Sequence, residues 1–363
     1  MIFIKKDGVE VNLELGVETL KGILIENKKN NIQREIPYIL PKKIEYSPNR
    51  YTVFIFFHNE CPENYIFQVY EKNINQRIGW IFPIQAILSN SHSYADDEHF
   101  LKIAYPAFIN LIYSKNIQPH NIPLLKENLT LEDFYSINSV ILILDNKELK
   151  KINNFKIRDY IPNLYQYGYS SKKNKIKSNK NIWNEFLEDI NSNKIRKRIT
   201  ISSISKKLKD DDFIFYLFEE ALSKEEHPVI RFYLLYQIIE LLIRKVFNDQ
   251  FKKKISFIKL EEEDLFDLNK KLQEMTNEKR RINLLFNKYT QISSPELEGL
   301  FLDFLNIKEK DEKTSLADLL YSVRTFLVHN YRQVTIQQKN LIGDINFYFE
   351  RIVIYLLINY NEK

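Results

Sequence analysis

Arg324 and His329 stand five positions apart near the C-terminal end of the sequence. A guanidinium keeps its charge at neutral pH and can hold and neutralise a phosphodiester. An imidazole, with an ordinary pKa of about 6.5, can accept or donate a proton in the same pH range. A cation for the phosphate and a group for proton transfer are sufficient for RNA cleavage without a metal ion. These two residues are therefore the first candidates for chemistry.

The apolar residues around this pair predict that it lies on a helix, with Arg324 at the edge of the buried face. That face comprises Leu316, Leu319, Leu320, Val323, Phe326 and Leu327. A helix turns about 100° per residue, so His329 is expected about 140° from Arg324 around the axis, whereas Tyr331 nearly superposes on Arg324. Three arrangements remain open: the pair flanks a groove from two sides, the helix ends or distorts near His329, or two such helices face each other.

Glu240 is a second unusual residue, because it stands inside the apolar run 238–243. A carboxylate is costly to bury unless a cation or hydrogen-bond donors compensate it. Arg324, at the edge of another predicted helix, is the natural partner. The alternative is that Glu240 simply reaches the surface.

The first half of the sequence predicts strands. Val11, Leu13 and Leu15 alternate with polar residues, and the short apolar runs 52–57 and 140–144 suit buried strands. Residues 99–115 have helical spacing in part, with Pro106 expected to break or kink the helix. We therefore expect a mixed, mainly-β N-terminal region.

From residue 183 onward the spacing is that of amphipathic helices. Helices are predicted from Pro228 through Val246 and over 263–289, 295–305, 315–332 and 341–360. A set of this size suggests a bundle. The predicted fold is α+β, with a β-rich domain of sensing or regulatory character over 1–167, a polar, basic linker over 168–182 and an all-α domain over 183–363.

Basic residues follow the predicted linker and could contact phosphates. They are Lys194, Arg196, Lys197 and Arg198, and Arg332 beside the motif is a further candidate for nucleic-acid binding. The alternative for the linker is a solvated connector. A net charge of +5 over 363 residues is mild and permits a polyanionic partner without requiring one.

Composition and known motifs limit the other function classes. Cys61 is the only cysteine, so neither an internal disulfide nor a thiolate metal site can form, which fits a reducing cytoplasm. The N-terminus lacks the apolar core of a signal peptide, and the longest apolar run is too short to cross a bilayer. The run from His92 to His99 holds metal-binding residue types, but a polar run of this kind is typical of an exposed loop. We expect a soluble protein without a metal or cofactor.

The motif and its setting resemble the HEPN superfamily (higher eukaryotes and prokaryotes nucleotide-binding). The resemblance covers about residues 183–363 and consists of Arg324-x4-His329 on the penultimate long helix, with Tyr236 and Glu240 on an earlier one. It implies a helical bundle that usually dimerises and often cleaves RNA without a metal. Arg324 would neutralise the scissile phosphate and His329 would act as general acid or base. The 2′-hydroxyl would attack, leaving a 2′,3′-cyclic phosphate and a 5′-hydroxyl.

Tyr331 extends the motif to Arg-x4-His-x-Tyr, which is similar to HEPN toxins whose tyrosine is adenylylated by a partner antitoxin. The residue after the arginine is often Asn, Asp or His in the family, and here it is Thr325. A β-rich region followed by a HEPN domain is similar to abortive-infection proteins of the ApeA-like kind. The resemblance thus implies an anti-phage or toxin effector that acts on RNA as a homodimer, with a phage trigger or an antitoxin as further partners. Glu240, Tyr331 and Asn330 would support the site.

A different class of function is also compatible with the sequence. The helical domain could mediate oligomerisation or binding without catalysis, while the N-terminal domain recognises a phage protein or a nucleic acid. Catalysis requires the side chains of Arg324 and His329 to face an open, basic cleft. Burial of both in local hydrogen bonds would favour the binding module.

Overall fold

A computed structural model describes most of the chain, namely residues 2–6, 9–19, 21–27, 32–42, 47, 49–58, 61–113, 129–172, 198–257, 265–308, 311 and 314–361. The chain divides into two compact units. The first comprises Met1–Ile157 with Tyr167–Ser202, and the second comprises Arg158–Gln166 with Ser203–Lys363. We call them the sheet unit and the helical unit.

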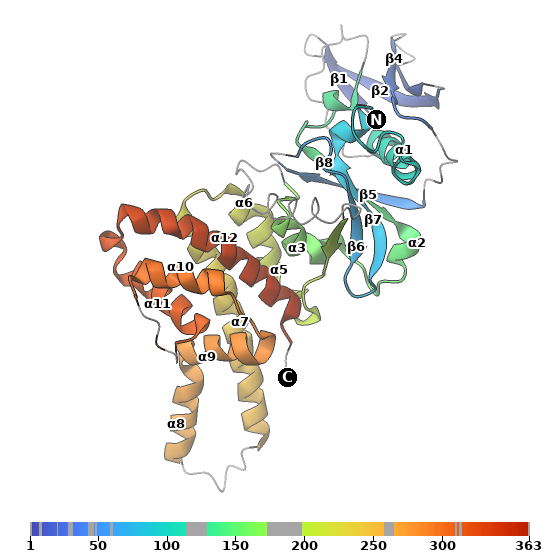
Figure 1. Ribbon diagram of the computed structural model, residues 1–363. Helices are drawn as coiled ribbons and strands as arrows, with labels where there is room; N and C mark the ends of the chain where they lie inside the picture. Colours follow the sequence, from blue (N-terminus) through green and yellow to red (C-terminus); the bar gives the residue numbers. More distant parts are fainter. Residues whose placement is uncertain are drawn as a thin grey trace. The chain divides into compact units, whose positions relative to one another are not determined.

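The sheet unit contains two sheets (Figure 1). The four-stranded sheet is antiparallel with the order β1-β2-β3-β4 and consists of β1 (Ile2–Lys6), β2 (Val9–Glu18), β3 (Gly22–Asn27) and β4 (Ile32–Pro37). The five-stranded sheet has the order β5-β8-β7-β6-β9 and consists of β5 (Tyr51–Phe57), β6 (Phe67–Glu71), β7 (Gln76–Pro83), β8 (Ser139–Asp145) and β9 (Arg198–Ile201). Strand β9 pairs parallel with β6, and the other neighbours pair antiparallel.

Helix α1 (Glu98–Tyr113) packs beside β5 and β8 and shares a hydrophobic core with both sheets. It runs through Pro106 without interruption, so of the break or kink predicted at this proline, the break does not occur. Pro106 and its neighbours on the helix are buried, so packing can offset the hydrogen bond that proline cannot make. The short helix α2 (Asn146–Leu149) follows β8. The short 3-10 helices are η1 (Ile84–Ile87), η2 (Leu131–Asp133) and η3 (Ile157–Tyr160).

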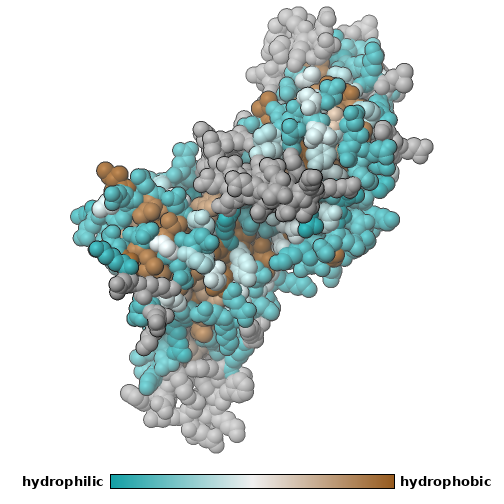
Figure 2. All heavy atoms as spheres, in the orientation of Figure 1, coloured by the Kyte–Doolittle hydropathy of each residue, from teal (hydrophilic) through white to brown (hydrophobic). Residues whose placement is uncertain are grey.

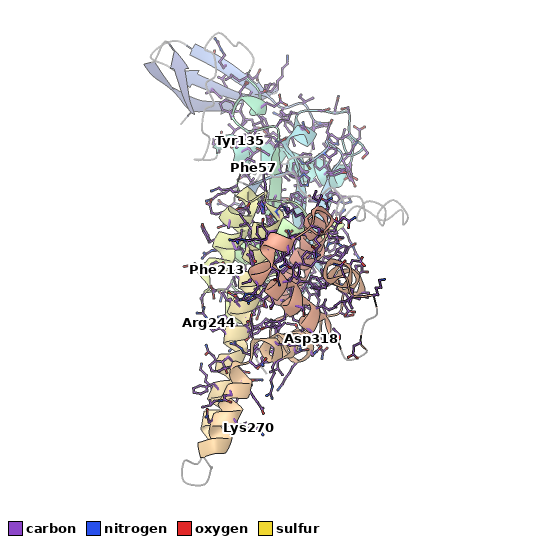
Figure 3. All side chains as sticks on the ribbon, turned by 90° about the vertical axis from the view of Figure 1, so that its left-hand side faces the viewer. Phe57, Tyr135, Phe213, Arg244, Lys270 and Asp318 are labelled. Atoms are coloured by element: carbon purple, nitrogen blue, oxygen red, sulfur yellow. The ribbon has the colours of Figure 1, made fainter. Side chains whose placement is uncertain are left out.

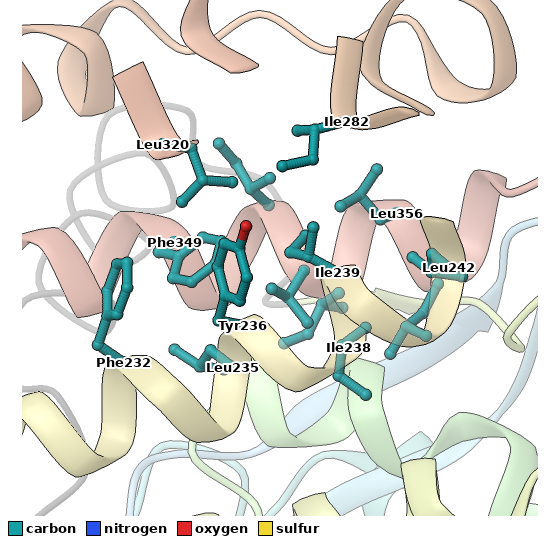
Figure 4. Packing of buried hydrophobic residues seen from close by; sticks show 14 of the residues in the cluster. Phe232, Leu235, Tyr236, Ile238, Ile239, Leu242, Ile282, Leu320, Phe349 and Leu356 are labelled. Atoms are coloured by element: carbon teal, nitrogen blue, oxygen red, sulfur yellow. The ribbon is translucent and has the colours of Figure 1, made fainter. Parts of the chain in front are cut away.

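The helical unit is built around α7 (Pro228–Phe257) and α12 (Ile336–Asn359), which pack along each other (Figure 1). Around them lie α3 (Ile161–Gln166), η4 (Lys206–Leu208), α5 (Asp212–Tyr216), η5 (Leu217–Ala221), α6 (Leu222–Lys224), α8 (Leu265–Thr276), α9 (Glu278–Leu284), η6 (Leu285–Thr290), α10 (Pro295–Leu305), α11 (Leu316–His329) and η7 (Tyr331–Gln333). Figure 4 shows side chains such as Phe232, Leu320 and Phe349 meeting in one core.

A buried ion pair fixes α3 to the long helices. The Nη2 atom of Arg231 on α7 lies 2.5 Å from Oε2 of Glu350 on α12, and it donates to the Tyr165 hydroxyl of α3 at 2.8 Å. Burial alone would lower the pKa of Arg231, but Tyr165 and Glu350 outweigh it and raise the pKa. Through Arg231, Tyr165 ties α3 to α7 and α12. This contact explains why α3, which precedes β9 in the sequence, belongs to the helical unit.

The predicted α+β class is confirmed, but the predicted division of the chain differs from the observed units. The segment Arg158–Gln166 lies with the helices although it falls in the predicted 1–167 domain, and β9 lies in the sheet although it falls in the predicted 183–363 domain. Of the predicted 168–182 linker, residues 173–182 lie outside the described residues. Among the described helices, none has both the length and the apolar content of a membrane span.

Candidate functional site

Helix α11, which carries the motif, begins with a hydrogen-bonded cap. The Ser315 hydroxyl accepts from the N–H of Asp318 at 3.2 Å, and the Asp318 carboxylate accepts from the N–H of Ser315 at 3.0 Å. Asn283 of α9 donates to the same carboxylate at 2.9 Å. Burial would raise the pKa of Asp318, but these hydrogen bonds and Lys279 lower it on balance. The start of α11 is thereby tied to α9.

The buried face of α11 sets the direction of Arg324. Leu320, Val323 and Leu327 are buried in the core of the unit, whereas Arg324 is half-buried at the edge of that face. This is the position that the apolar spacing predicts.

Arg324 lies between an aromatic ring and a carboxylate, both from α7. Its guanidinium carbon is 5.6 Å from the centre of the Tyr236 ring, and its Nη2 atom is 3.7 Å from Oε1 of Glu240. The Glu240 side chain keeps 49% of its surface exposed and that of Arg324 keeps 25%. Glu240 therefore reaches the surface and also faces its predicted partner, so the two alternatives for this residue occur together.

Tyr236 is the buried side of this arrangement. Figure 4 shows the ring extending from α7 into the core of the helical unit. Its hydroxyl donates to Oε1 of Glu278 at 2.8 Å, and Glu278 is the first residue of α9. Burial, followed by the negative charge of Glu278, raises the pKa of Tyr236 well above its ordinary value. The ring beside Arg324 thus remains a neutral phenol that is fixed at both ends.

Tyr233, one turn before Tyr236 on α7, extends the same surface. Burial raises the pKa of Tyr233, the charge of Arg324 acts against this rise, and Tyr331 adds to it. Tyr233 therefore lies within electrostatic reach of both Arg324 and Tyr331, which brings the last residue of the extended motif to the region of the arginine.

His329 is the last residue of α11 and its side chain is exposed. The N–H of Asn330 still donates to the carbonyl of Phe326 at 2.7 Å, after which the chain turns into η7. The helix predicted over 315–332 is thus too long. Because α11 ends at His329, the superposition of Tyr331 on Arg324 along a straight helix is wrong, although Tyr331 returns to the same region by another route.

The structure brings together only part of the predicted site. Arg324, Glu240 and Tyr236 are in contact, and Tyr331 is exposed nearby. No hydrogen bond joins the side chains of His329 and Arg324 within the described part of the chain. The two residues are not both buried in local hydrogen bonds, so the arrangement that would favour the binding module is not observed.

Thr325 is turned away from the surface that Arg324 occupies. Its Oγ1 atom is buried, and among the described residues it has no hydrogen-bond partner. The position next to the arginine therefore does not supply an accessible polar group, as an Asn, Asp or His there could.

The basic candidates separate into three groups. Arg332 is exposed on η7 in the helical unit. Arg198 is exposed on β9 of the sheet unit, 5.6 Å from the centre of the Tyr70 ring, so its assignment to the helical domain is wrong. Lys194, Arg196 and Lys197 lie outside the described residues.

Two further residues of this surface were not predicted from the sequence, Glu278 and Tyr233. A buried tyrosine usually needs a hydrogen-bond partner for its hydroxyl, and this requirement was the only signal for a residue such as Glu278. Neither residue belongs to the Arg-x4-His pattern.

A further exposed cation lies on α7. Figure 3 marks Arg244, which is one turn beyond Glu240 on the same helix.

The histidines of the predicted 92–99 loop have separate surroundings. His92 is buried, with its Nε2 atom 2.8 Å from the carbonyl oxygen of Ala86 and its Nδ1 atom accepting from the N–H of Tyr94 at 3.2 Å. These bonds give His92 a structural role. His99 lies on α1 and is exposed. In the part of the chain that the structure describes, His, Cys, Asp and Glu side chains do not gather into a metal-binding group.

No family model, curated protein or solved structure matches this chain. A functional proposal therefore depends on the chemistry of the residues described above.

Proposed function

We propose that the helical unit is a metal-independent endoribonuclease of the HEPN type. The observation that carries the proposal is the setting of Arg324: a permanently charged, accessible guanidinium on a helix that ends five residues later in an exposed imidazole. The contacts with Tyr236 and Glu240 support the proposal, because they join Arg324 to the helix whose residues form part of the resemblance.

Arg324 would bind and neutralise the phosphate that is cleaved. The Tyr236 ring orients the guanidinium, while Glu240 is exposed and 3.7 Å away. A pair of this kind contributes at most about 1 kcal/mol, so a phosphate can replace the carboxylate as the partner. Charge-assisted bonds between a guanidinium and a phosphate are stronger than such a surface pair.

His329 would transfer the protons. Its exposed position, with no hydrogen bond to a described residue, leaves either ring nitrogen accessible to a substrate. In the proposed step the 2′-hydroxyl loses its proton to a base and attacks phosphorus, and the 5′-oxygen leaves with a proton from an acid. The products are a 2′,3′-cyclic phosphate and a 5′-hydroxyl. His329 serves as the acid or the base in each site, and a water molecule serves as the other.

A second copy of the chain would place its His329 beside Arg324 of the first. Arg324 and His329 point about 140° apart on one helix, which does not suit a site within one α11. Exposed apolar residues flank the motif: Val328 keeps 46% of its surface accessible, Tyr331 43% and Ile336 79%. Figure 2 shows hydrophobic residues on this side of the helical unit. A homodimer that covers them would bring two copies of the motif together.

The biological role proposed with this activity is that of an anti-phage or toxin effector. The sheet unit would sense a trigger, and RNA cleavage would halt growth of the infected cell. Tyr331 is exposed, as modification of its hydroxyl by a partner antitoxin would require.

Cleavage of single-stranded RNA in excess EDTA tests the proposal. We expect the wild-type protein to cleave and to leave 2′,3′-cyclic phosphate ends, and Arg324→Ala and His329→Ala each to reduce the rate about 100-fold or more. Matched controls are Arg280→Ala and His227→Ala, which replace exposed residues of the same types in the helical unit and should leave the rate unchanged.

Cleavage that persists in both motif variants would contradict the proposal, as would strict dependence on a metal. If the wild-type protein binds RNA or another macromolecule but never cleaves RNA, the non-catalytic binding or oligomerisation module becomes the better explanation of the helical unit.

A further inference from the structure

A hollow of about 720 Å³ opens in the sheet unit, far from the motif in sequence. It lies where β5 and β7 begin and β6 and β8 end, and helix α1 forms another part of its wall. All its lining residues belong to the sheet unit. A volume of this size is within the range of small-molecule sites, which extends from about 300 to 1,000 Å³.

Four cations and two carboxylates line the hollow, and the carboxylates are already paired. Arg50 lies 3.3 Å from Asp145, and Lys151 lies 2.6 Å from Glu148. Within each pair the positive and negative charges cancel. The remaining positive charge of the hollow therefore comes from its other two cations.

The excess charge belongs to Arg77 and Lys102. Within the described residues neither forms an ion pair, although both are exposed to solvent in the hollow. Lys102 shares one face of α1 with His99, three positions earlier, which also lines the hollow. Two uncompensated cations, with a titratable imidazole beside them, thus come from a strand and a helix that are apart in sequence.

A β-bulge directs Arg77 toward this hollow. The register of β6 and β7 shifts between Val69 and Tyr70, so that Ile78 is an extra residue in β7. The shift pairs Arg77 with Tyr70 and turns it to the face of the sheet that carries Trp80. The guanidinium carbon of Arg77 lies 5.7 Å from the centre of the Trp80 ring. If β7 instead alternated strictly through Ile78, Arg77 would lie on the opposite face from Trp80.

Tyr51 lines the hollow beside the same cations. Burial raises the pKa of Tyr51, whereas the charges of Arg50 and Arg77 act against this rise. Both guanidinium groups are therefore within electrostatic reach of the Tyr51 hydroxyl, which makes no hydrogen bond to a described residue. The wall thus offers a hydroxyl and an aromatic edge next to the free positive charge.

We propose that this hollow is a binding site for a small phosphate ester, with Arg77 and Lys102 holding the phosphate. A phosphate monoester carries close to two negative charges at pH 7, which matches the two uncompensated cations, whereas a carboxylate would balance only one. Its three oxygens can accept from both elements at once. Nothing in this inference depends on RNA cleavage by the helical unit.

Calorimetric titration of the full chain tests the site. The probes are adenosine 5′-monophosphate, ribose 5-phosphate and inorganic phosphate, with adenosine as the uncharged control. We expect saturable binding of one phosphate probe per chain and none of adenosine. Arg77→Gln and Lys102→Gln should each weaken the binding at least tenfold, while Lys156→Gln, at an exposed lysine of the same unit outside the hollow, should leave it unchanged.

The relative affinities of the three phosphate probes show which part of the ligand the site recognises. Tighter binding of the nucleotide than of the sugar phosphate assigns a contribution to the aromatic wall, and equal binding assigns recognition to the phosphate alone. Absence of saturable binding by every probe would overturn the inference, as would binding that is unchanged in both Arg77→Gln and Lys102→Gln. Repeating the titration with Arg324→Ala separates this result from the proposed nuclease, because that variant should bind the probes as the wild type does.

Discussion

At the scale of single residues, Tyr236 determines how Arg324 is presented. The Tyr236 ring lies against the guanidinium of Arg324, and the Tyr236 hydroxyl donates to Glu278 at the start of α9. A cation over an aromatic ring gains between about 0.5 and 2 kcal/mol, and an exposed ion pair such as that with Glu240 gains at most about 1 kcal/mol. Because Tyr236 is buried and held by Glu278, it is the more rigid of the two partners.

Two substitutions at this position separate the ring from the hydroxyl. Tyr236→Phe keeps the ring and removes the hydrogen bond to Glu278, which should cost about 1 kcal/mol of unfolding free energy and leave RNA cleavage nearly unchanged. Tyr236→Leu also removes the surface beneath Arg324 and should reduce cleavage. Urea unfolding and cleavage rates measure both effects. Equal cleavage by the Leu variant and the wild type would show that the ring does not position Arg324.

The residues of this site differ in how well the sequence predicts them. Apolar spacing places Arg324 at the edge of the buried face of its helix, and an isolated carboxylate in an apolar run points to Glu240. The contact with Glu278 depends on how α7 and α9 cross, which spacing within one helix cannot reveal. The same holds for the hollow in the sheet unit, where a one-residue bulge turns Arg77 to the other face.

At the scale of elements, α11 depends on the cap at its first residue. Ser315 and Asp318 bond to each other's backbone N–H groups, and Asn283 anchors the carboxylate to α9. Ser315→Ala should lower the unfolding free energy by about 1 kcal/mol. Ser322→Ala is a matched control, because Ser322 lies on the same helix but bonds only to the carbonyl of Asp318. Equal effects in urea unfolding would contradict the capping role.

The long amphipathic helices can be predicted from the spacing of apolar residues alone, because each buries one continuous apolar face. Strand β9 cannot be predicted in this way. Its four residues, two exposed and two buried, are stabilised by pairing with β6, which is far away in sequence. Helix α1 shows the reverse case, in which burial on both sides of Pro106 overrides the local tendency of proline to end a helix.

At the scale of the whole molecule, a buried histidine of the sheet unit makes the stability of the chain sensitive to acid. His58 is buried in the sheet unit, and this burial lowers its pKa from 6.5 to about 4. As the pH falls from about 6.5 to about 4, the imidazole of His58 takes up a proton in the unfolded chain but stays neutral in the folded chain. Unfolding is therefore favoured progressively from about pH 6.5 down to about pH 4.

The expected loss from His58 is on the order of 2 to 3 kcal/mol at pH 4 relative to pH 7. His58→Leu removes the titrating group, so the unfolding free energy of this variant should change less over the same window. Urea unfolding of both proteins at intervals from pH 7 to pH 4 makes the comparison. Parallel pH dependence in the two proteins would show that His58 is not the source.

The most direct test of the proposed nuclease is complementation between two inactive variants. Arg324→Ala and His329→Ala are unfolded together, refolded as a mixture and assayed for RNA cleavage in EDTA. If each site combines Arg324 of one chain with His329 of the other, half of the random dimers regain one intact site, and the mixture should recover about a quarter of the wild-type rate. A mixture that remains as inactive as its two components would contradict a site shared in this way.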